Sequence, residues 1–404
     1  MLRKALTIVL ILIGLATESL FSQAIDRKEL VGSDLNAIQS AVPFLNIAPD
    51  SRSGAMGDVG VATDPDVNSL HWNAAKYAFI KEEAGVGISY TPWLRNLVPD
   101  INLAYLIGYK RLDRQQVISG SLRYFSLGEI IFTNQFGQVI KPFNPNEFAL
   151  DAGYSRLFSD NFSGALAFRF IRSDLTGNFS QPGVTDGDTK AGVAYAADIS
   201  FYYNKDIEIE DKDANMAFGM NISNIGNKIS YTDNMDPEFI PINLRLGGNL
   251  KLQLDDYNTM AFSLDLNKLL VPSPPEYFKD SLDANNEPVV EYGYDPNVPV
   301  PLGMVRSFYD APGGFREEIR EIMVSLGTEY WYREQFAIRA GYFHEAAMKG
   351  NRKYLTFGVG LKMNVFGIDF AYLAPVSGRQ NPLANTIRFT LLFDFDRYRN
   401  TNTN

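Results

Sequence analysis

The chain has 404 residues, of which 46% are hydrophobic and 13% aromatic, with 47 acidic against 37 basic residues and no cysteine. Without cysteine, disulfides, thiol catalysis and a lipid-modified N-terminal cysteine are excluded. The acidic balance and the lack of a long basic run argue against nucleic-acid binding.

Residues 1–24 have the features of an export signal. Arg3 and Lys4 precede an apolar run from Ala5 to Ala16, and small residues near Ser22 and Ala24 suit cleavage. No later stretch supplies the roughly twenty continuous apolar residues that a membrane helix requires. We therefore expect a removable signal peptide.

Residues 25–83 form a second predicted unit. The stretch 41–50 is apolar and leads through the glycine-rich stretch 54–61 to a histidine, a tryptophan and an asparagine at 71–73. This composition is too hydrophobic for a tail, and its glycine density suggests tight backbone packing. We expect a plug-like segment that docks in the lumen of the barrel predicted below or seals its periplasmic end.

Residues 84–396 break into about fourteen segments in which apolar side chains alternate with polar or small ones. This pattern predicts strands with one face toward lipid and the other toward water, although a soluble β-sandwich also alternates. The predicted strands are 84–91, 101–110, 116–127, 146–157, 161–173, 191–204, 213–223, 242–254, 257–267, 319–331, 335–344, 352–362, 365–373 and 384–394.

The connections between these segments are alternately long and short, which favours a barrel over a sandwich. Outer-membrane barrels have short periplasmic turns and long outer loops. The prediction is an all-β fold: a membrane-spanning antiparallel outer-membrane β-barrel of about 14 strands, with both chain ends periplasmic. A polar tail, 397–404, follows it. The short turns include 112–115, 158–160, 255–256, 332–334 and 364, and the long loops include 128–145, 174–190, 224–241 and 268–318.

Charged side chains recur at the alternate strand positions that are predicted to face the lumen. Such a lumen suits water or an ion-paired seal better than a lipid tail. The residues are Arg169, Arg245, Lys251, Asp265, Arg339, Lys362, Asp369 and Arg388.

No constellation for catalysis, cofactor binding or metal binding is recognisable. The two histidines, His71 and His344, have no carboxylate at a metal-ligand spacing. We expect no enzyme activity. The acidic run Asp206, Glu208, Glu210, Asp211 and Asp213 has oxygen ligands that suit calcium but lacks the spacing of a calcium loop, so a solvated turn is the favoured interpretation.

Two of the predicted outer loops, 128–145 and 268–318, are rich in aromatic and apolar residues, and the second is also rich in proline. Exposed aromatics supply contact area, so these loops are candidate partner-binding surfaces. For 268–318 the alternative is a lid folded over the barrel mouth, and for 128–145 it is packing against the barrel. The candidate binding residues are Phe132, Phe136, Phe143, Tyr277, Phe278, Tyr292, Phe308 and Tyr309.

The N-terminal unit carries a motif made of Pro43, Gly57, Asp58, Gly60, Trp72 and Asn73. With this motif the chain resembles the PorV (LptO) family of the type IX secretion system of Bacteroidota, a branch of the FadL-like transporters. The Gly-Asp-x-Gly and Trp-Asn elements alone indicate only the broader FadL-like group. Ala74 departs from the family, which usually has proline there.

The resemblance implies a fourteen-stranded barrel that acts in protein secretion without catalysis. It implies that the chain binds the C-terminal signal domain of cargo leaving the giant translocon barrel and shuttles the cargo to a sortase-like attachment complex at the cell surface. Membrane lipid and lipopolysaccharide would surround the barrel. The alternative is a FadL-like transporter of hydrophobic small molecules; a general porin fits less well, because the N-terminal segment would block the pore.

Overall fold

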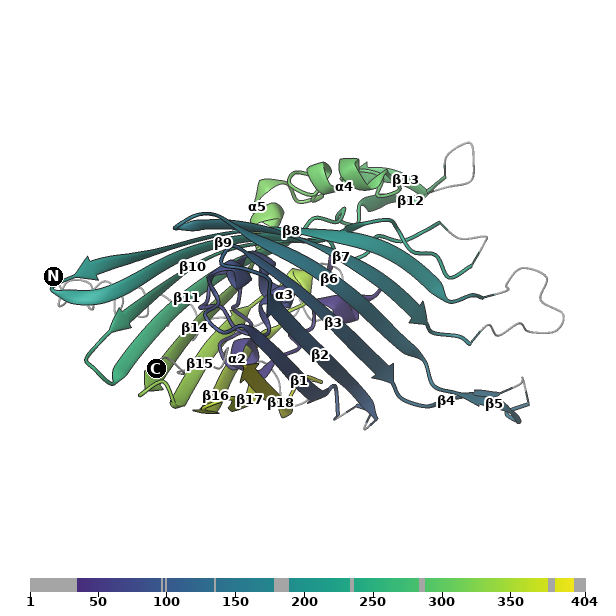
Figure 1. Ribbon diagram of the computed structural model, residues 1–404. Helices are drawn as coiled ribbons and strands as arrows, with labels where there is room; N and C mark the ends of the chain where they lie inside the picture. The colour runs from purple at the N-terminus through teal and green to yellow at the C-terminus, as the bar shows by residue number, and fades with distance from the viewer. Residues whose placement is uncertain are drawn as a thin grey trace.

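Fourteen strands close into one antiparallel barrel (Figure 1). The computed structural model describes residues 35–395 except 96, 99, 134–135, 178–188, 233–235, 283–287 and 377–381. The strands are β1 Ala84–Pro92, β2 Ile101–Arg111, β3 Gln116–Leu127, β6 Asn146–Ser159, β7 Phe162–Asp174, β8 Gly192–Ile209, β9 Lys212–Gly226, β10 Asn243–Gln253, β11 Asn258–Leu269, β14 Met323–Tyr332, β15 Phe336–His344, β16 Lys353–Met363, β17 Phe366–Pro375 and β18 Thr386–Phe395.

The fold prediction is confirmed: each of the fourteen predicted segments overlaps one barrel strand. Consecutive barrel strands pair along the chain, and β1 closes the ring by pairing with β18, Ala84 opposite Phe395. The β-sandwich alternative is therefore excluded, because the strands form a single closed sheet. The predicted signal peptide and the polar tail 397–404 lie outside the described residues.

The alternation in sequence becomes a two-sided wall. Leu246, Phe262 and Leu264 point outward and are each 43% exposed, whereas Arg245 and Asp265 on the opposite parity are buried. All eight charged residues predicted to face inward are buried or half-buried. The wall therefore presents apolar side chains outside and polar ones inside, as the lipid-facing barrel requires.

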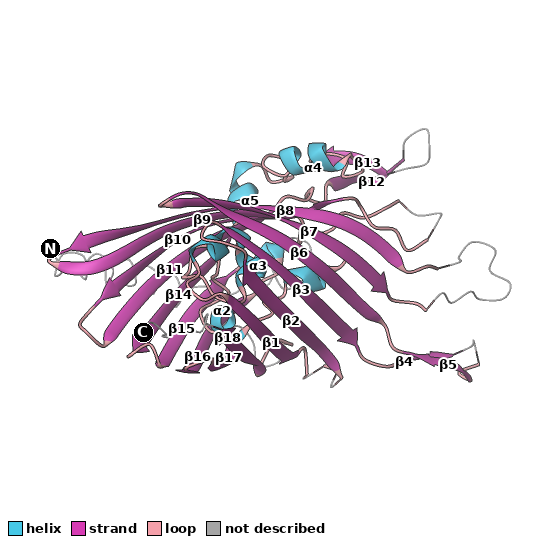
Figure 2. Cartoon of the chain, viewed as in Figure 1, coloured by secondary structure: helices cyan, strands magenta, loops and turns pink. Residues whose placement is uncertain are grey.

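The N-terminal segment occupies the lumen (Figure 2). It contains η1 Pro43–Asn46, α2 Ser51–Gly54, α3 Ser69–Trp72 and η2 Ala74–Phe79. The Asn36 N–H donates to the Met348 carbonyl in a long connection, and the Glu83 N–H donates to the Phe395 carbonyl at the opposite end. The segment therefore traverses the lumen, from the long connections at Asn36 to the short-turn end at Glu83.

Two long connections fold into small elements of their own. The connection after β3 forms a hairpin, and the connection after β11 forms a second hairpin and two short helices, grouped at the top of Figure 1. None of the helices in the described residues is long and apolar enough to cross a membrane. These elements are β4 Ile130–Thr133, β5 Val139–Phe143, β12 Glu276–Leu282, β13 Pro288–Tyr292, α4 Val300–Arg306 and α5 Phe315–Arg320, with η3 Ala347–Lys349 after β15.

Two predicted strand boundaries differ from the structure by four residues or more. The strand expected from residue 319 begins at Met323, because Phe315–Arg320 forms α5. The strand expected to end at residue 204 continues to Ile209, so part of the acidic run is strand rather than turn. At the tip of this hairpin Glu210 and Asp211 have φ values of 52° and 60°.

Candidate functional site

Glycines allow the lumenal segment to lie directly against the barrel wall. Gly57 has φ +71°, and a Cβ there would lie 2.6 Å from the Tyr342 carbonyl oxygen and 2.7 Å from that of Leu326. On the wall, a Cβ at Gly341 would lie 2.0 Å from the Met56 carbonyl carbon. Backbone therefore packs on backbone here, which only glycine permits.

The Trp-Asn element of the motif fixes the fold of the segment. The Trp72 indole N–H donates to Asp50 at 2.7 Å, and the Arg245 guanidinium lies 5.0 Å from the centre of the Trp72 ring. The Asn73 amide donates to the Val61 carbonyl and to the Phe201 carbonyl of the wall, both at 2.9 Å. These side chains tie one part of the segment to another and to the barrel.

The remaining motif residues also contribute to the packing of the lumenal segment. Pro43 begins η1, which buries Phe44. Asp58 accepts a hydrogen bond from the Tyr354 hydroxyl at 2.5 Å. Gly60 lies against Trp72, since a Cβ at Gly60 would be 2.3 Å from the indole ring. All six motif residues thus belong to the lumenal segment and its packing.

Ion pairs join the segment and the wall in the middle of the barrel. Arg339 pairs with Glu329 at 2.8 Å and with Asp369 at 2.5 Å, and Arg52 of α2 reaches the same Glu329 at 2.8 Å. Elsewhere Arg169 bridges two further wall carboxylates, Asp151 and Asp198. The charged lumen predicted from the sequence thus contains buried ion pairs in this region.

The lumen half nearest the long connections is apolar. Phe44 stacks on Phe125 with 6.0 Å between ring centres. Leu45 and Ile242 are buried in the same cluster, which also includes Phe239 from the connection after β9. The chain therefore fills this apolar interior with its own side chains.

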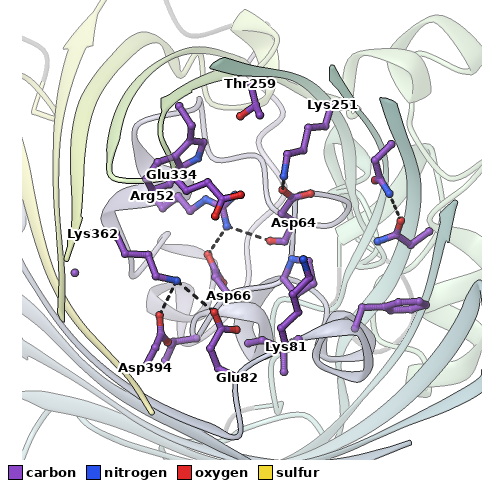
Figure 3. A pocket seen from close by; sticks show the side chains of 18 of the residues that line it. Arg52, Asp64, Asp66, Lys81, Glu82, Lys251, Thr259, Glu334, Lys362 and Asp394 are labelled. Carbon is purple, nitrogen blue, oxygen red and sulfur yellow. Dashed lines mark hydrogen bonds and ion pairs between the residues drawn. The ribbon is translucent and has the colours of Figure 1, made fainter. Parts of the chain in front are cut away.

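At the other end of the lumen, beside the short turns, a cavity of about 1060 Å³ opens. We call it the vestibule (Figure 3). Charged pairs line it: Lys251 with Asp64 at 2.7 Å, and Lys362 with Asp394 at 3.1 Å and Glu82 at 3.4 Å. Apolar side chains such as Val67, Ile80 and Leu392 share the lining with these charged groups, so the space is mixed in character and suits water and charged groups better than a wholly hydrophobic ligand.

The connection 270–322, here called the cap, is anchored by buried charges. Lys268 of β11 pairs with Glu318 at 3.1 Å and with Glu321 at 2.6 Å. Lys349 of η3 pairs with Glu317 at 2.5 Å, and the Asn36 amide donates to the same Glu317 carboxylate at 2.9 Å. The cap is thus held by the barrel rim and by the lumenal segment together.

A further carboxyl in the cap has a shifted pKa. Asp310 accepts a hydrogen bond from the Ser273 N–H at 3.3 Å, and burial raises the pKa of Asp310 to about 6. Glu318 nearby acts in the same direction. By contrast, the Lys349 ammonium holds the pKa of Glu317 below its usual value, against the opposing effect of burial.

Sequence reasoning missed these cap anchors. Asn36 and Glu317 are 281 positions apart, and Lys268 and Glu318 are 50 apart. No local pattern connects such residues. The glutamates of α5 are indistinguishable in sequence from an ordinary solvated helix face.

The predicted binding aromatics lie in the two long connections and divide into two groups. Phe132 and Phe143 stack on each other within the β4–β5 hairpin, with ring centres 6.3 Å apart, and are half-buried. The others are exposed: Phe136 by 77%, Tyr292 by 55%, Tyr309 by 53%, Phe308 by 52%, Phe278 by 47% and Tyr277 by 44%.

The histidines have structural partners. His71 lies 2.6 Å from the Arg123 guanidinium, and His344 lies 3.2 Å from the Tyr342 hydroxyl. No group of three or more histidine, aspartate or glutamate side chains in the described residues is arranged to hold a metal ion.

A closed fourteen-stranded wall, apolar outside and filled by its own N-terminal segment, defines a plugged membrane-spanning β-barrel. Residues 31–276 match the model of the family described as type IX secretion system protein PorV. The chain belongs to this family and is therefore an outer-membrane component of the type IX secretion system. No curated protein sequence gives a significant match.

Solved structures similar to the chain are distant. The Pseudomonas putida toluene transporter TodX has 12% identity and a TM-score of 0.47, covering 87% of this chain and 99% of its own. The Ralstonia pickettii toluene transporter TbuX has 12% identity and a TM-score of 0.45, with 86% and 98% covered. A Pseudomonas aeruginosa FadL homologue has 11% identity and a TM-score of 0.38, with 89% and 100% covered.

Proposed function

We propose that this protein is a non-catalytic receptor for secreted cargo. It binds the C-terminal signal domain of proteins leaving the type IX translocon barrel and carries them to the sortase-like attachment complex. The observation that carries the proposal is the contrast between the rim and the lumen. Exposed aromatics stand on folded elements at one rim, whereas the lumen is occupied by the chain itself.

In the proposed orientation the short turns and the C-terminal end of β18 face the periplasm, and the cap and the β4–β5 hairpin face outward. This follows the usual arrangement of outer-membrane barrels, which have short periplasmic turns and longer outer loops. Cargo then meets the outer rim after it has passed the membrane. The apolar outer wall remains available for lipid, for lipopolysaccharide and for docking to the translocon barrel.

A rim of separate aromatic contacts suits a shuttle. The receptor must bind strongly enough to remove cargo from the translocon and weakly enough to release it to the next complex. Differences in affinity between related complexes arise mainly from the dissociation rate, and shallow contacts keep the dissociation of cargo fast. Tyr294 and Tyr309 pack edge to face with 6.0 Å between ring centres, so part of this surface is pre-ordered before cargo arrives.

Binding of a purified signal domain to the detergent-solubilised protein tests the proposal. Deleting residues 130–143, or combining Phe136→Ser with Tyr292→Ser and Tyr309→Ser, should weaken binding at least tenfold, which is about 1.4 kcal/mol. Phe158→Ser is the matched control, because Phe158 is 59% exposed at the short-turn end. Equal affinities of all variants would contradict the proposal, provided that each keeps the heat-resistant gel mobility of a folded barrel.

The alternative, transport of hydrophobic small molecules, has less support. A transporter needs an apolar path, yet the apolar part of this lumen already holds Phe44 and Leu45. At the short-turn end, ion pairs interrupt the apolar part of the vestibule lining, so no continuous apolar path is formed there.

A further inference from the structure

The β8–β9 hairpin extends beyond both of its neighbours at the short-turn end (Figure 1). Strand β7 follows β8 only as far as the pair Phe162 and Tyr203. Strand β10 follows β9 only as far as Leu252 and Ala214, whereas β8 and β9 stay paired to Ile209 and Lys212. Residues 204–213 are therefore a two-stranded ribbon, here called the ribbon, whose edges carry no further strand among the described residues.

The turn of the ribbon determines which backbone groups are free to pair. Glu210 and Asp211 both have positive φ, as in a two-residue type I′ turn. Ile209 and Lys212 then form the hydrogen-bonded pair next to the turn, so Glu208 and Asp213 form a non-hydrogen-bonded pair. The backbone N–H and C=O of Glu208, and of Asp206 two residues earlier, consequently point to the open edge of β8.

The Asn204 backbone supports this assignment. Its N–H donates to the Asn161 carbonyl, in the turn between β6 and β7, at 2.9 Å. Residues 204, 206 and 208 share this direction because strand backbone groups alternate. The hydrogen-bonding row used by β7 thus continues, unoccupied, past the end of β7.

The same ribbon presents three carboxylates on its lumen-facing side. Asp206 and Glu208 continue the inward row of the buried Ser200 and Tyr202, and Asp213 faces Glu208 directly across the pair. Side chains approach closely in a non-hydrogen-bonded pair, and like charges placed opposite each other are unfavourable. Within the described part of the chain, no basic side chain forms an ion pair within 4.0 Å with these three carboxylates.

Several other carboxylates of the vestibule are ion-paired, unlike those of the ribbon. Asp206 and Asp213 line the vestibule. Across it, Asp64 is paired with Lys251, and Asp394 and Glu82 share Lys362. Asp160 and Glu334 also line the vestibule and form no ion pair within 4.0 Å in the described part of the chain, but only the ribbon combines such carboxylates with an open strand edge.

We propose that the ribbon docks an extended segment of a periplasmic protein that carries lysine or arginine at alternate positions. The segment adds a strand to the free edge of β8, which supplies main-chain hydrogen bonds at Asp206 and Glu208. Its alternate basic side chains lie toward the vestibule, against the carboxylates of Asp206, Glu208 and Asp213. The relevant partner is on the periplasmic side, so this interaction is separate from cargo binding at the outer rim.

A synthetic peptide with lysine at every second position tests the proposal. Its binding to the full-length protein in detergent is measured by fluorescence anisotropy, beside a peptide of the same composition with all lysines in one block. We expect the alternating peptide to bind more tightly. The triple variant Asp206→Asn, Glu208→Gln, Asp213→Asn should weaken its binding at least about tenfold.

The matched control removes three negative charges from the opposite end of the barrel: Glu129→Gln, Glu276→Gln, Glu291→Gln. This variant should bind the alternating peptide as the wild type does. The proposal is overturned if the wild type does not bind that peptide, if both peptides bind equally, or if both triple variants lose the same affinity. Cargo binding at the outer rim should be unchanged in the ribbon variant, so the two proposals fail independently.

Discussion

Arg339 illustrates how individual charged side chains hold the lumen together. It is 2% exposed and pairs with Glu329 and Asp369, and Asp369 has no other ion pair in the described chain. A buried pair contributes little net stability compared with an apolar alternative, but removing one partner leaves an uncompensated charge. The stability of the barrel should therefore depend strongly on each member of the network.

Arg339→Met should destabilise the folded barrel by about 3–5 kcal/mol, because it leaves the Asp369 carboxylate buried and unpaired. Urea unfolding followed by tryptophan fluorescence measures the change. Arg114→Met, in an exposed turn, is the control and should alter stability by less than about 0.5 kcal/mol. Equal stability of the two variants would show that the buried pairs do not hold the barrel.

Gly341 tests the contact between the wall and the lumenal segment. Gly341→Ala forces a methyl group against the backbone at Met56 and Gly57, and should cost about 1–3 kcal/mol by overpacking. Hydrogen exchange of residues 35–83 should accelerate. Gly248→Ala has its nearest contact at 3.5 Å and should leave exchange unchanged; acceleration in both variants would exclude a specific effect of the contact.

Among the elements outside the wall, the cap has a pH dependence that follows from Asp310. Because burial raises its pKa from 3.8 to about 6, the folded cap favours the protonated carboxyl. The stability that this provides is complete below pH 3.8 and is lost as pH rises through about 6. Glu317 acts in the opposite sense, with stability lost as pH falls below its unfolded pKa of 4.5.

Hydrogen-exchange protection of residues 300–321, corrected for intrinsic exchange, should therefore be lower at about pH 8 than at about pH 5. Asp310→Asn should flatten this dependence, since the amide does not titrate. Glu276→Gln in the exposed strand β12 is the control and should retain it. A dependence that persists in Asp310→Asn would assign the effect to another group.

The barrel strands were predictable because their evidence is local. Alternation over 242–254 placed β10 within one residue at each end, Asn243–Gln253. The helix α5 was not predictable, because its glutamates gain their positions from Lys268 and Lys349, which are distant in sequence. The acidic run was interpreted as a solvated turn because its composition resembles that of a loop. The structure shows that these residues continue β8 and that the turn itself comprises only Glu210 and Asp211.

The candidate site was predictable only in part. The aromatic content of the long connections identified the exposed residues Tyr292 and Tyr309, but composition does not distinguish them from Phe132 and Phe143, which pack on each other. Likewise, the motif around Trp72 and Asn73 indicated the family. Its structural role, which is to hold the lumenal segment in place, became clear only from the hydrogen bonds to Asp50 and to the wall.

The complete barrel combines a filled lumen with two unlike ends. The purified protein should therefore show no steady conductance in planar bilayers, because α2 and the segment around Gly57 are packed against the wall by ion pairs and backbone contacts. The Gly341→Ala variant should show intermittent openings. Porin-like conductance of the wild type would show that the segment does not close the pore.

The most direct test of the secretion role is a strain that lacks this protein. Proteins in the medium, on the cell surface and in the periplasm are compared with those of the parent strain, with uptake of a fatty acid measured in parallel. We predict that proteins sharing a C-terminal signal domain disappear from the medium and the surface while uptake is unchanged. Normal secretion with impaired uptake would contradict the receptor role and favour the transporter.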